Sequence, residues 1–321
     1  MHTLDELGQL FSERFSVNHF PDEPHGLYEP NNYFLSIGGK RIRPLLVLMA
    51  NELFGDIHED SWKVATALEL MHNFTLIHDD IMDDAPVRHG KATVHELYGA
   101  STAILAGDVM LIRAYQYLNQ IDISYLRVIN EIFNLTSTEI CEGQQYDMAF
   151  EERSDVSLDE YFKMISLKTS VLLAASLKMG SIIGGASVRN QEHLYQFGLN
   201  LGIAFQIQDD YLDCFGDPEK FGKMIGGDIK KNKKTFLAIH LQNVADNTEK
   251  QELLQLQSAT EQLKVERTLA IMRNNGVDKW AWNLKQEYFN KAMYHLEEIA
   301  VIATRKEELK YLAEFLISRE H

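Results

Sequence analysis

Residues 62–84, WKVATALELMHNFTLIHDDIMDD, decide the fold class, because an apolar helix ends there in a cluster of carboxylates. Hydrophobic side chains recur along this segment at helical spacing. Positions 72, 76, 79 and 83 form one stripe of such a helix, so His72, Asp79 and Asp83 point in the same direction. The apolar residues just before the acids indicate that the helix comes out of a protein core.

The two carboxylates of Asp79 and Asp83 lie one turn apart and repel each other, with no lysine between them. A hard divalent cation relieves this repulsion, and Mg²⁺ commonly joins one or two carboxylates to the phosphates of a substrate. The alternative interpretation is an acidic helix end that lies in solvent. The cluster alone leaves both interpretations open.

A second acidic cluster favours the metal site. Residues 206–213 read Gln-Ile-Gln-Asp-Asp-Tyr-Leu-Asp and follow an apolar segment dotted with glycine, so this helix also comes from the core. Positions 206, 209, 210 and 213 again share one stripe. Two opposed carboxylate sets can hold several Mg²⁺ ions around one diphosphate. We therefore expect residues 79 and 209 to face each other across an apolar pocket.

The remaining sequence reads as one helix after another, with little strand-like alternation. Several predicted helices are long and apolar on more than one face, which is typical of a large all-α bundle. Ser157 and Glu160 form a predicted capping box, and Gly184 with Gly185 ends the segment that they open. The predicted helices are Leu45–Phe54, Trp62–Asp83, Ala100–Asn119, Tyr125–Phe150, Leu158–Ile183 and Gln191–Phe215.

The domain organisation is predicted to be simple. The chain has 321 residues and only 6 prolines, and no stretch reads as a flexible linker, so we expect residues 1–321 to form a single domain. From about Ala259 onward the sequence is more charged and resembles an outer layer of helices.

Charge and cysteine content exclude several classes of protein. A formal net charge of −16 would repel nucleic acid, so no nucleic-acid partner is expected. It would also repel anionic small molecules, unless basic clusters or metal ions reverse the local field. The 2 cysteines, Cys141 and Cys214, exclude a disulfide framework and fit the cytoplasm.

No transmembrane segment or secretory signal is expected from the sequence. The longest apolar stretch, Val171–Ala186, is interrupted by Lys178 and is too short to cross a bilayer. The first twenty residues lack a basic start followed by an apolar run.

Basic residues gather in three segments, two of which directly follow the acidic clusters. Gly38–Pro44 combines glycines with Lys40, Arg41 and Arg43 at the start of a helix, which suits a phosphate group. The segment 86–93 carries Arg88, His89 and Lys91, and the lysine-rich segment 216–235 carries Lys223 and Lys233 among others. Each of these segments could instead be a solvated surface patch.

Taken together, these motifs resemble the trans-type polyprenyl synthetase family, which includes the farnesyl and geranylgeranyl diphosphate synthases. The resemblance implies an all-α isoprenoid synthase fold around a deep central cavity, a homodimer and about three Mg²⁺ ions per site. It also implies that isopentenyl diphosphate condenses with an allylic diphosphate (dimethylallyl, geranyl or farnesyl) and that diphosphate is released. The motifs that carry the resemblance are Gly38–Pro44, Asp79–Asp83, Gly143–Asp147, Lys168-Thr169, Asp209–Asp213 and Gly226–Ile229.

The resemblance further implies a role for individual residues. The implied metal ligands are Asp79, Asp83, Asp209 and Asp213, with Asp80 and Asp210 beside them. The implied ligands of the allylic diphosphate are Arg88, Lys168, Lys223 and Lys233. Those of isopentenyl diphosphate are Lys40, Arg43, His72 and His89. Thr169 and Gln206 would lie beside the carbocation, and Gln144 and Asp147 would support the residues that touch substrate.

One residue departs from the family pattern. The family usually has two arginines before the glycine of the first basic segment, whereas this chain has Arg88-His89-Gly90. A histidine is not reliably charged at neutral pH. We therefore expect weaker, pH-sensitive binding of isopentenyl diphosphate, which a Michaelis constant that is flat across neutral pH would contradict.

Product length is the least determined part of the prediction. By resemblance, the residue five before Asp79, which is Phe74, forms the floor of the pocket and favours a product of fifteen or twenty carbons. On a simple helical wheel Phe74 turns away from Asp79, and Thr75 and Met71 face the site better. The first motif lacks the insertion common in bacterial farnesyl synthases, so we expect geranylgeranyl diphosphate before farnesyl diphosphate.

Two other functions compete with this prediction. A class I terpene cyclase shares the fold and one aspartate motif but usually carries a different second metal motif and needs no Gly38–Pro44 segment. A non-catalytic subunit of a heteromeric synthase would typically lose one metal motif, and this chain keeps both.

Overall fold

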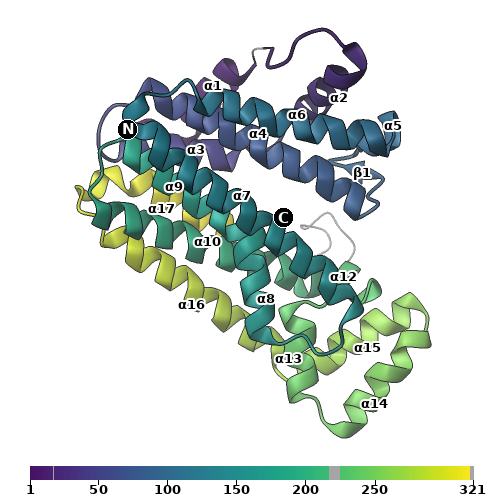
Figure 1. Cartoon of the computed structure of the whole chain (residues 1–321). Coiled ribbons are helices and arrows are strands. Elements are labelled where there is room, and N and C mark those ends of the chain that lie inside the picture. The colour runs from purple at the N-terminus through teal and green to yellow at the C-terminus, as the bar shows by residue number, and fades with distance from the viewer. Residues whose placement is uncertain (17, 217–224, 319–321) are drawn as a thin grey trace. The chain divides into compact units, whose positions relative to one another are not determined.

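The structure is a computed structural model that describes residues 1–16, 18–216 and 225–318. In chain order its first elements are α1 (Leu4–Phe15), α2 (His25–Ile37), α3 (Ile42–Glu52), α4 (Glu59–Met82), β1 (Val87–Arg88), β2 (Lys91–Ala92), α5 (Val94–Tyr98), α6 (Ala100–Leu118), α7 (Ile123–Glu152), α8 (Leu158–Ile165), the π-helical turn η1 (Ser166–Ser170), α9 (Val171–Ile183) and α10 (Val188–Phe215). The later elements are α12 (Gly227–Lys230), α13 (Phe236–Val244), α14 (Asn247–Gln255), the 3₁₀ turn η2 (Leu256–Ser258), α15 (Glu261–Asn274), α16 (Val277–Glu297), the 3₁₀ turn η3 (Ala303–Arg305) and α17 (Glu307–Ser318). Figure 1 shows this chain of helices, and the β1–β2 hairpin is the only sheet in the described part.

The described residues fall into two compact units. Unit 1 comprises Met1–Ser137, Ala175–Glu192 and Ala300–Glu308, and unit 2 comprises Thr138–Ala174, His193–Ile299 and the C-terminal segment from Leu309. The prediction of one domain over residues 1–321 stays a prediction.

Unit 1 is organised around α4, which packs along α6 and against α3 (Figure 1). Residues 44–52 of α3 are all buried, and most of the residues of α4 before Asp79 are buried as well. Helix α9 approaches α3 so closely that a Cβ added at Gly180 would lie 2.0 Å from the carbonyl oxygen of Val47. An apolar interior of this kind holds α4 in a fixed position and delivers the acids at its C-terminal end.

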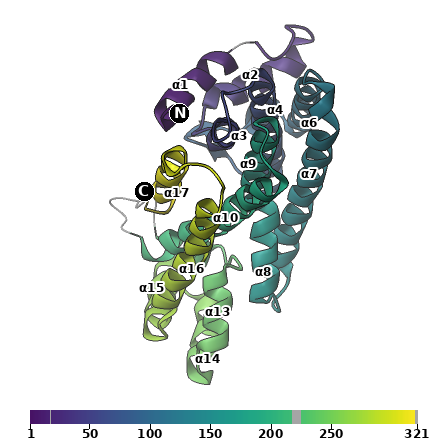
Figure 2. The ribbon, with the colours of Figure 1, turned by 90° about the vertical axis from the view of Figure 1, so that its left-hand side faces the viewer.

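Unit 2 contains its own hydrophobic core, to which α8, α10, α13, α15 and α16 contribute. The large aromatic rings of Tyr161, Phe162 and Phe236 meet there, with centroids 5.7 to 6.3 Å apart. Helices α15 and α16 lie side by side, and α16 also contacts α13 (Figure 2). The outer helical layer predicted after Ala259 therefore consists of α15, α16 and α17, of which α15 and α16 bury apolar side chains in this core.

The predicted helices are confirmed, with one internal difference. The predicted capping box is present, because the Ser157 side chain accepts from the backbone of Glu160 and the Glu160 side chain accepts in return. Gly185 follows α9 with φ +80°, a conformation that favours glycine. The segment predicted as one helix over Leu158–Ile183 instead contains the π-helical turn η1.

Within the described part of the chain, one segment is long and apolar enough to cross a membrane by length and composition alone. It is Leu158–Ile183, which is longer than the apolar stretch recognised in the sequence because α8, η1 and α9 follow one another without a break. About two thirds of its most apolar window, 67%, is buried inside the protein, as is usual for a core helix.

Candidate active site

The first acidic cluster lies at the C-terminal end of α4. Asp80 is buried, whereas Asp79 is partly exposed and Asp83 is exposed. The backbone N–H of Asp83 donates to the carbonyl oxygen of Asp79 at 2.9 Å, so Asp83 closes the last turn of the helix. The C-terminal end of a helix carries partial negative charge, which disfavours carboxylates there. This donor set of hard oxygen atoms therefore fits a divalent cation such as Mg²⁺.

Arg88 on β1 neutralises one of these acids. Its Nε atom donates to both carboxylate oxygens of Asp80 at 3.0 Å, and its Nη2 atom donates to Oδ1 of Asp80 at 2.7 Å. The same Nη2 atom lies 4.0 Å from Oδ2 of Asp79. Asp80 thus positions Arg88 beside Asp79, a contact that the sequence stripe did not indicate.

A cluster of partly buried basic residues, Arg43, His72 and Arg88, lies within unit 1, where the charges of both arginines act on His72. Arg43 stands in the first turn of α3, and its Nε atom is buried without a hydrogen-bond partner among the described residues. Burial lowers the pKa of Arg43 to about 10, so the guanidinium keeps its charge at neutral pH. A buried charged donor without an acceptor is costly, and an anionic ligand would satisfy it.

His72 and Glu69 are near enough to this cluster for the Arg43 charge to act on both. Burial and the charges of Arg43 and Arg88 lower the pKa of His72 well below its usual value, so the ring is neutral at pH 7. Burial raises the pKa of Glu69, against the opposing effect of the Arg41 and Arg43 charges. The structure therefore brings together Arg43, His72 and Arg88, which the sequence assigned to two substrates.

The hairpin that carries Arg88 turns at His89 and Gly90. Their φ angles are +48° and +76°, a left-handed pair that a two-residue hairpin turn requires. Histidine tolerates this conformation better than most residues. Both His89 and Lys40 are exposed in unit 1, and the binding role predicted for each stays a prediction.

The second acidic cluster lies on α10 in unit 2. Asp209 is exposed, while Asp210 is buried and accepts hydrogen bonds from the Tyr161 hydroxyl and, at 3.1 Å, from the Gln206 amide. Burial raises the pKa of Asp210 to about 7, and the neighbouring Asp228 charge adds to the effect. Asp210 is thus held by protein donors, and Asp209 is the acid of the pair that is exposed.

Asp213 is tied to the glycine segment that precedes α12. Its Oδ2 atom accepts the backbone N–H of Asp228 at 3.0 Å, and its carbonyl oxygen accepts the N–H of Gly226 at 2.6 Å. A Cβ added at Gly227 would lie 3.0 Å from Oδ1 of Asp213, which explains glycine at that position. The carboxylate predicted as a metal ligand therefore already accepts a hydrogen bond from this segment.

The lysine predicted to bind diphosphate in unit 2 lies on the π-helical turn. Nζ of Lys168 donates to Oδ2 of Asp147 on α7 at 2.7 Å. A Cβ added at Gly143 would lie only 2.4 Å from the backbone nitrogen of Lys168, so α7 and η1 touch along their backbones. Thr169 and Gln144 are partly buried in the same region of unit 2.

Two further lysines were predicted to bind the diphosphate. Lys233 is exposed, and its backbone N–H donates to the carbonyl oxygen of Asp228 at 2.9 Å. Its charge also opposes the raised pKa values of Asp210 and Asp228. Lys223 lies outside the described residues.

The residues predicted to set product length all lie on α4. The Phe74 ring contacts the His78 ring edge to face, with centroids 5.0 Å apart. Thr75 donates from its hydroxyl to the carbonyl oxygen of His72 at 2.8 Å. Met71 is fully buried, and its sulfur accepts a hydrogen bond of 3.8 Å from the Ser137 hydroxyl.

Some residues of the site escaped the sequence analysis. Tyr161 holds Asp210, and no spacing signal links residues 49 positions apart. Glu69 could have been found, because it lies one turn before His72 on the same predicted helix and near two arginines of the Gly38–Pro44 segment. The acids of the two predicted clusters belong to different units, so the expectation that they face each other stays a prediction.

Comparison with known proteins identifies the family. A model of the polyprenyl synthetase family matches residues 24–272. A geranylgeranyl diphosphate synthase of Saccharolobus solfataricus is 39% identical over 98% of each chain, and a short chain isoprenyl diphosphate synthase of Methanothermobacter thermautotrophicus is 35% identical over 100% of this chain and 99% of its own. A crystal structure of a geranylgeranyl pyrophosphate synthase, 42% identical, superposes with a TM-score of 0.94 over 100% of both chains. The chain has the all-α isoprenoid synthase fold and belongs to the polyprenyl synthetase family.

Proposed function

We propose that this chain condenses isopentenyl diphosphate with an allylic diphosphate and releases diphosphate, forming a short trans-isoprenyl diphosphate. It is a transferase, and its product is geranylgeranyl diphosphate rather than farnesyl diphosphate. The observation that carries the proposal is the Arg43 guanidinium, whose buried Nε atom has no acceptor among the described residues and whose charge, with that of Arg88, acts on His72. The names of similar proteins, which include geranylgeranyl diphosphate synthases, support the product length.

Divalent metal is part of the proposal. Asp79, Asp83 and Asp209 would hold Mg²⁺, because they are the carboxylates at partly exposed or exposed positions, and Asp213 would assist. Three Mg²⁺ ions per site is the proposed count. When bound, the metal neutralises the diphosphate and stabilises it as it departs. Asp80 and Asp210 would act by holding Arg88, Tyr161 and Gln206 in place.

The protein's own cations would bind and orient the two substrates. Arg43, Lys40 and His72, with His89, would hold isopentenyl diphosphate, while Arg88, Lys168, Lys223 and Lys233 would hold the allylic diphosphate. His72, neutral at pH 7, would donate one N–H to a phosphate oxygen without adding charge. Thr169 and Gln206 would present dipoles to the carbocation, with Gln144 and Asp147 supporting them.

The bond changes follow from this arrangement of groups. The allylic carbon–oxygen bond breaks and leaves a delocalised carbocation, which the double bond of isopentenyl diphosphate attacks. Loss of a proton then forms the new double bond. The departing diphosphate is the proposed proton acceptor, because the carboxylates of the site are assigned to metal and the neutral His72 to a phosphate oxygen.

The test is a condensation assay with the purified chain. Radiolabelled isopentenyl diphosphate, Mg²⁺ and each allylic diphosphate in turn should give a labelled product of twenty carbons, resolved by chromatography after removal of phosphate. The Asp79→Ala substitution should raise the activation free energy by at least about 3 kcal/mol, which lowers the rate roughly a hundredfold. A terpene cyclase would release a hydrocarbon without label, and an inactive subunit would incorporate none, so either result would overturn the proposal.

The chain is proposed to act as a homodimer in the cytoplasm. Exposed apolar side chains on α6, namely Ile104, Leu105 and Ile112, support a subunit contact on that helix. Both cysteines are free thiols, which supports a reducing compartment.

A further inference from the structure

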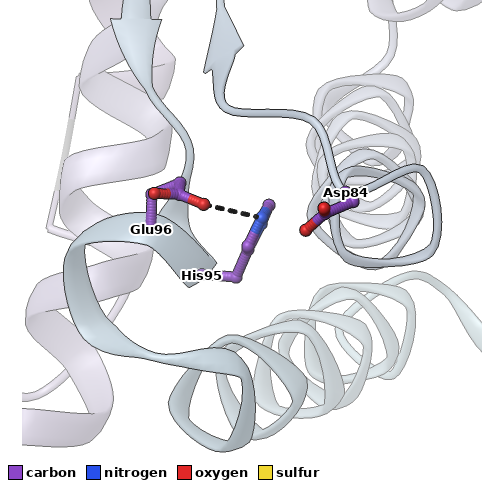
Figure 3. Close-up of side chains that lie close together, drawn as sticks. All are labelled: Asp84, His95 and Glu96. Atoms are coloured by element: carbon purple, nitrogen blue, oxygen red, sulfur yellow. Dashed lines mark ion pairs between the residues drawn. The ribbon is translucent and has the colours of Figure 1, made fainter.

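A group of three potential metal ligands lies beyond the end of α4, separate from the aspartates assigned to Mg²⁺. Asp84 is the second residue after α4, while His95 and Glu96 belong to α5 (Figure 3). Each side chain offers one ligand atom, and these atoms all lie within 4.8 Å of one another. Figure 3 shows the His95 ring between the carboxylates of Glu96 and Asp84.

Of the three residues, His95 gives the strongest indication of a metal site. Its side chain is only 9% exposed, and both ring nitrogens are buried without a hydrogen-bond partner among the described residues. A buried imidazole normally donates from one nitrogen and accepts at the other, and each unsatisfied polar atom costs about 1–3 kcal/mol. The ring therefore has a lone pair to offer, next to two carboxylates.

The distances suit a metal ion of the first transition series. Nε2 of His95 and Oε1 of Glu96 lie 3.6 Å apart. Two ligands of a tetrahedral zinc ion, with bonds of about 2.1 Å, lie about 3.4 Å apart. Asp84 is exposed, and its ligand atom lies within 4.8 Å of the other two, so its side chain would need to close by at most about 1.4 Å to complete the set.

The backbone presents Asp84 toward this position. Its φ angle is +48°, and aspartate adopts this left-handed conformation more readily than most residues. Its N–H donates to the carbonyl oxygen of Ile81 at 3.3 Å, which fixes the residue at the end of the helix. Its carboxylate therefore stands on the far side of His95 from Glu96 (Figure 3).

We propose that Asp84, His95 and Glu96 form a second metal site, which binds a divalent transition ion such as Zn²⁺ or Co²⁺. An imidazole with two carboxylates prefers these ions to Mg²⁺, which favours oxygen ligands alone. The bound ion joins the end of α4 to α5 and so fixes the segment between them, residues 85–94, which carries Arg88. The inference does not depend on the condensation reaction, because binding is measured without substrate.

The experiment is a calorimetric titration of the full chain with Co²⁺ in the presence of millimolar Mg²⁺. The wild-type chain should bind one Co²⁺ that Mg²⁺ does not displace. Glu96→Gln and His95→Gln should each weaken that binding at least about tenfold. Glu96 is exposed, so its variant tests the site even if the buried His95 variant fails to fold.

Two matched variants separate this site from other binding. His25→Gln removes an exposed histidine that lies 4.0 Å from a single carboxylate, Glu29, and should leave Co²⁺ binding unchanged. Asp79→Asn alters the Mg²⁺ ligands and should also leave it unchanged. The proposal is overturned if the wild-type chain binds no Co²⁺ under these conditions, if Glu96→Gln binds it as tightly as wild type, or if Asp79→Asn abolishes it.

A crystal grown with Co²⁺ gives a second readout that does not depend on activity. Anomalous scattering at the cobalt edge should place a peak between Asp84, His95 and Glu96, and that peak should be absent from Glu96→Gln crystals. A cobalt peak confined to Asp79 and Asp83 would overturn the assignment.

Discussion

Arg43 holds a charged nitrogen inside unit 1 with no acceptor for its Nε atom among the described residues. With a pKa of about 10 the side chain stays charged through the neutral range. Arg43→Gln should therefore raise the Michaelis constant for isopentenyl diphosphate. A hydrogen bond to a charged group contributes about 1.5–3 kcal/mol, so kcat/KM for that substrate should fall roughly 10- to 150-fold.

The matched control for this prediction is Arg127→Gln. Arg127 lies on α7 with 90% of its side chain exposed, and it pairs with Glu131 one turn further along the same helix. Steady-state kinetics with each substrate varied in turn should show no effect of this control. An Arg43→Gln variant with an unchanged Michaelis constant for isopentenyl diphosphate would remove Arg43 from the substrate site.

Phe74 tests the proposed control of product length. Its ring is held against His78, so truncation to alanine opens space beside α4. Phe74→Ala should lengthen the product by at least one isoprene unit, as measured by chromatography of the dephosphorylated product. If Thr75→Ala or Met71→Ala lengthens the product and Phe74→Ala does not, the residues that the helical wheel indicates limit product length and Phe74 does not.

The sequence identified the acidic clusters but could not distinguish the roles of adjacent aspartates. Asp79 and Asp80 are neighbours, yet Arg88 holds only Asp80 in a two-pronged pair. Likewise Asp209 is exposed, while Tyr161 and Gln206 hold Asp210. The burial of a side chain and its hydrogen-bond partners depend on how the whole protein packs, and helical spacing alone predicts neither of them.

Helical periodicity predicted the helices of the site well, because long apolar segments leave few alternatives. It missed the π-helical turn at Ser166–Ser170, whose sequence Ser-Leu-Lys-Thr-Ser contains no glycine or proline to signal an irregularity. It also gave no secondary structure for residues 86–93, where β1 and β2 pair as two-residue strands. Both features are too short for periodicity to detect. The π-helical turn also contacts Gly143 of α7 through the Lys168 backbone, and tertiary packing, which periodicity does not describe, sets that contact.

His19, which follows α1, makes unit 1 sensitive to acid. Its Nε2–H donates to the Phe15 carbonyl at 2.9 Å, and its Nδ1 accepts from the Tyr117 hydroxyl at 2.8 Å, so the neutral ring is fully bonded. Burial lowers its pKa from 6.5 to about 4. Above pH 6.5 the neutral ring contributes its full stability, and this is lost as the pH falls towards 4, because the unfolded chain takes up the proton first.

The loss at pH 4 is at most about 3 kcal/mol, since one pKa unit corresponds to about 1.4 kcal/mol. Urea denaturation at several pH values between 7 and 4 measures the free energy of unfolding. His19→Gln keeps a donor and an acceptor but does not titrate, so its free energy of unfolding should fall less over this range. Parallel curves for the two proteins would show that His19 contributes nothing to the acid sensitivity.

At the scale of the whole molecule, the charge of −16 shapes which ligands the chain can bind. An acidic protein that acts on diphosphates needs local reversal of its field, and unit 1 supplies Arg43 and Arg88 beside the acids assigned to metal. Removal of divalent cations with a chelator should therefore abolish condensation, since the carboxylates would then repel the substrate. Activity in the labelled assay should return when Mg²⁺ is added in excess.

The exposed apolar side chains of α6 allow a test of the proposed homodimer. Ile104, Leu105 and Ile112 lie within about 100° of one another around α6, and between 47% and 56% of each is exposed. Apolar side chains grouped in this way are covered in most soluble proteins by a partner. Leu105→Glu combined with Ile112→Glu should convert the dimer to a monomer, as light scattering after size exclusion would show at micromolar concentration. Leu254→Glu on α14, which changes a leucine in unit 2 that is 72% exposed, should leave the molar mass at twice that of the chain. A wild-type protein that elutes as a monomer, or a double variant that remains a dimer, would place the subunit contact elsewhere or exclude it.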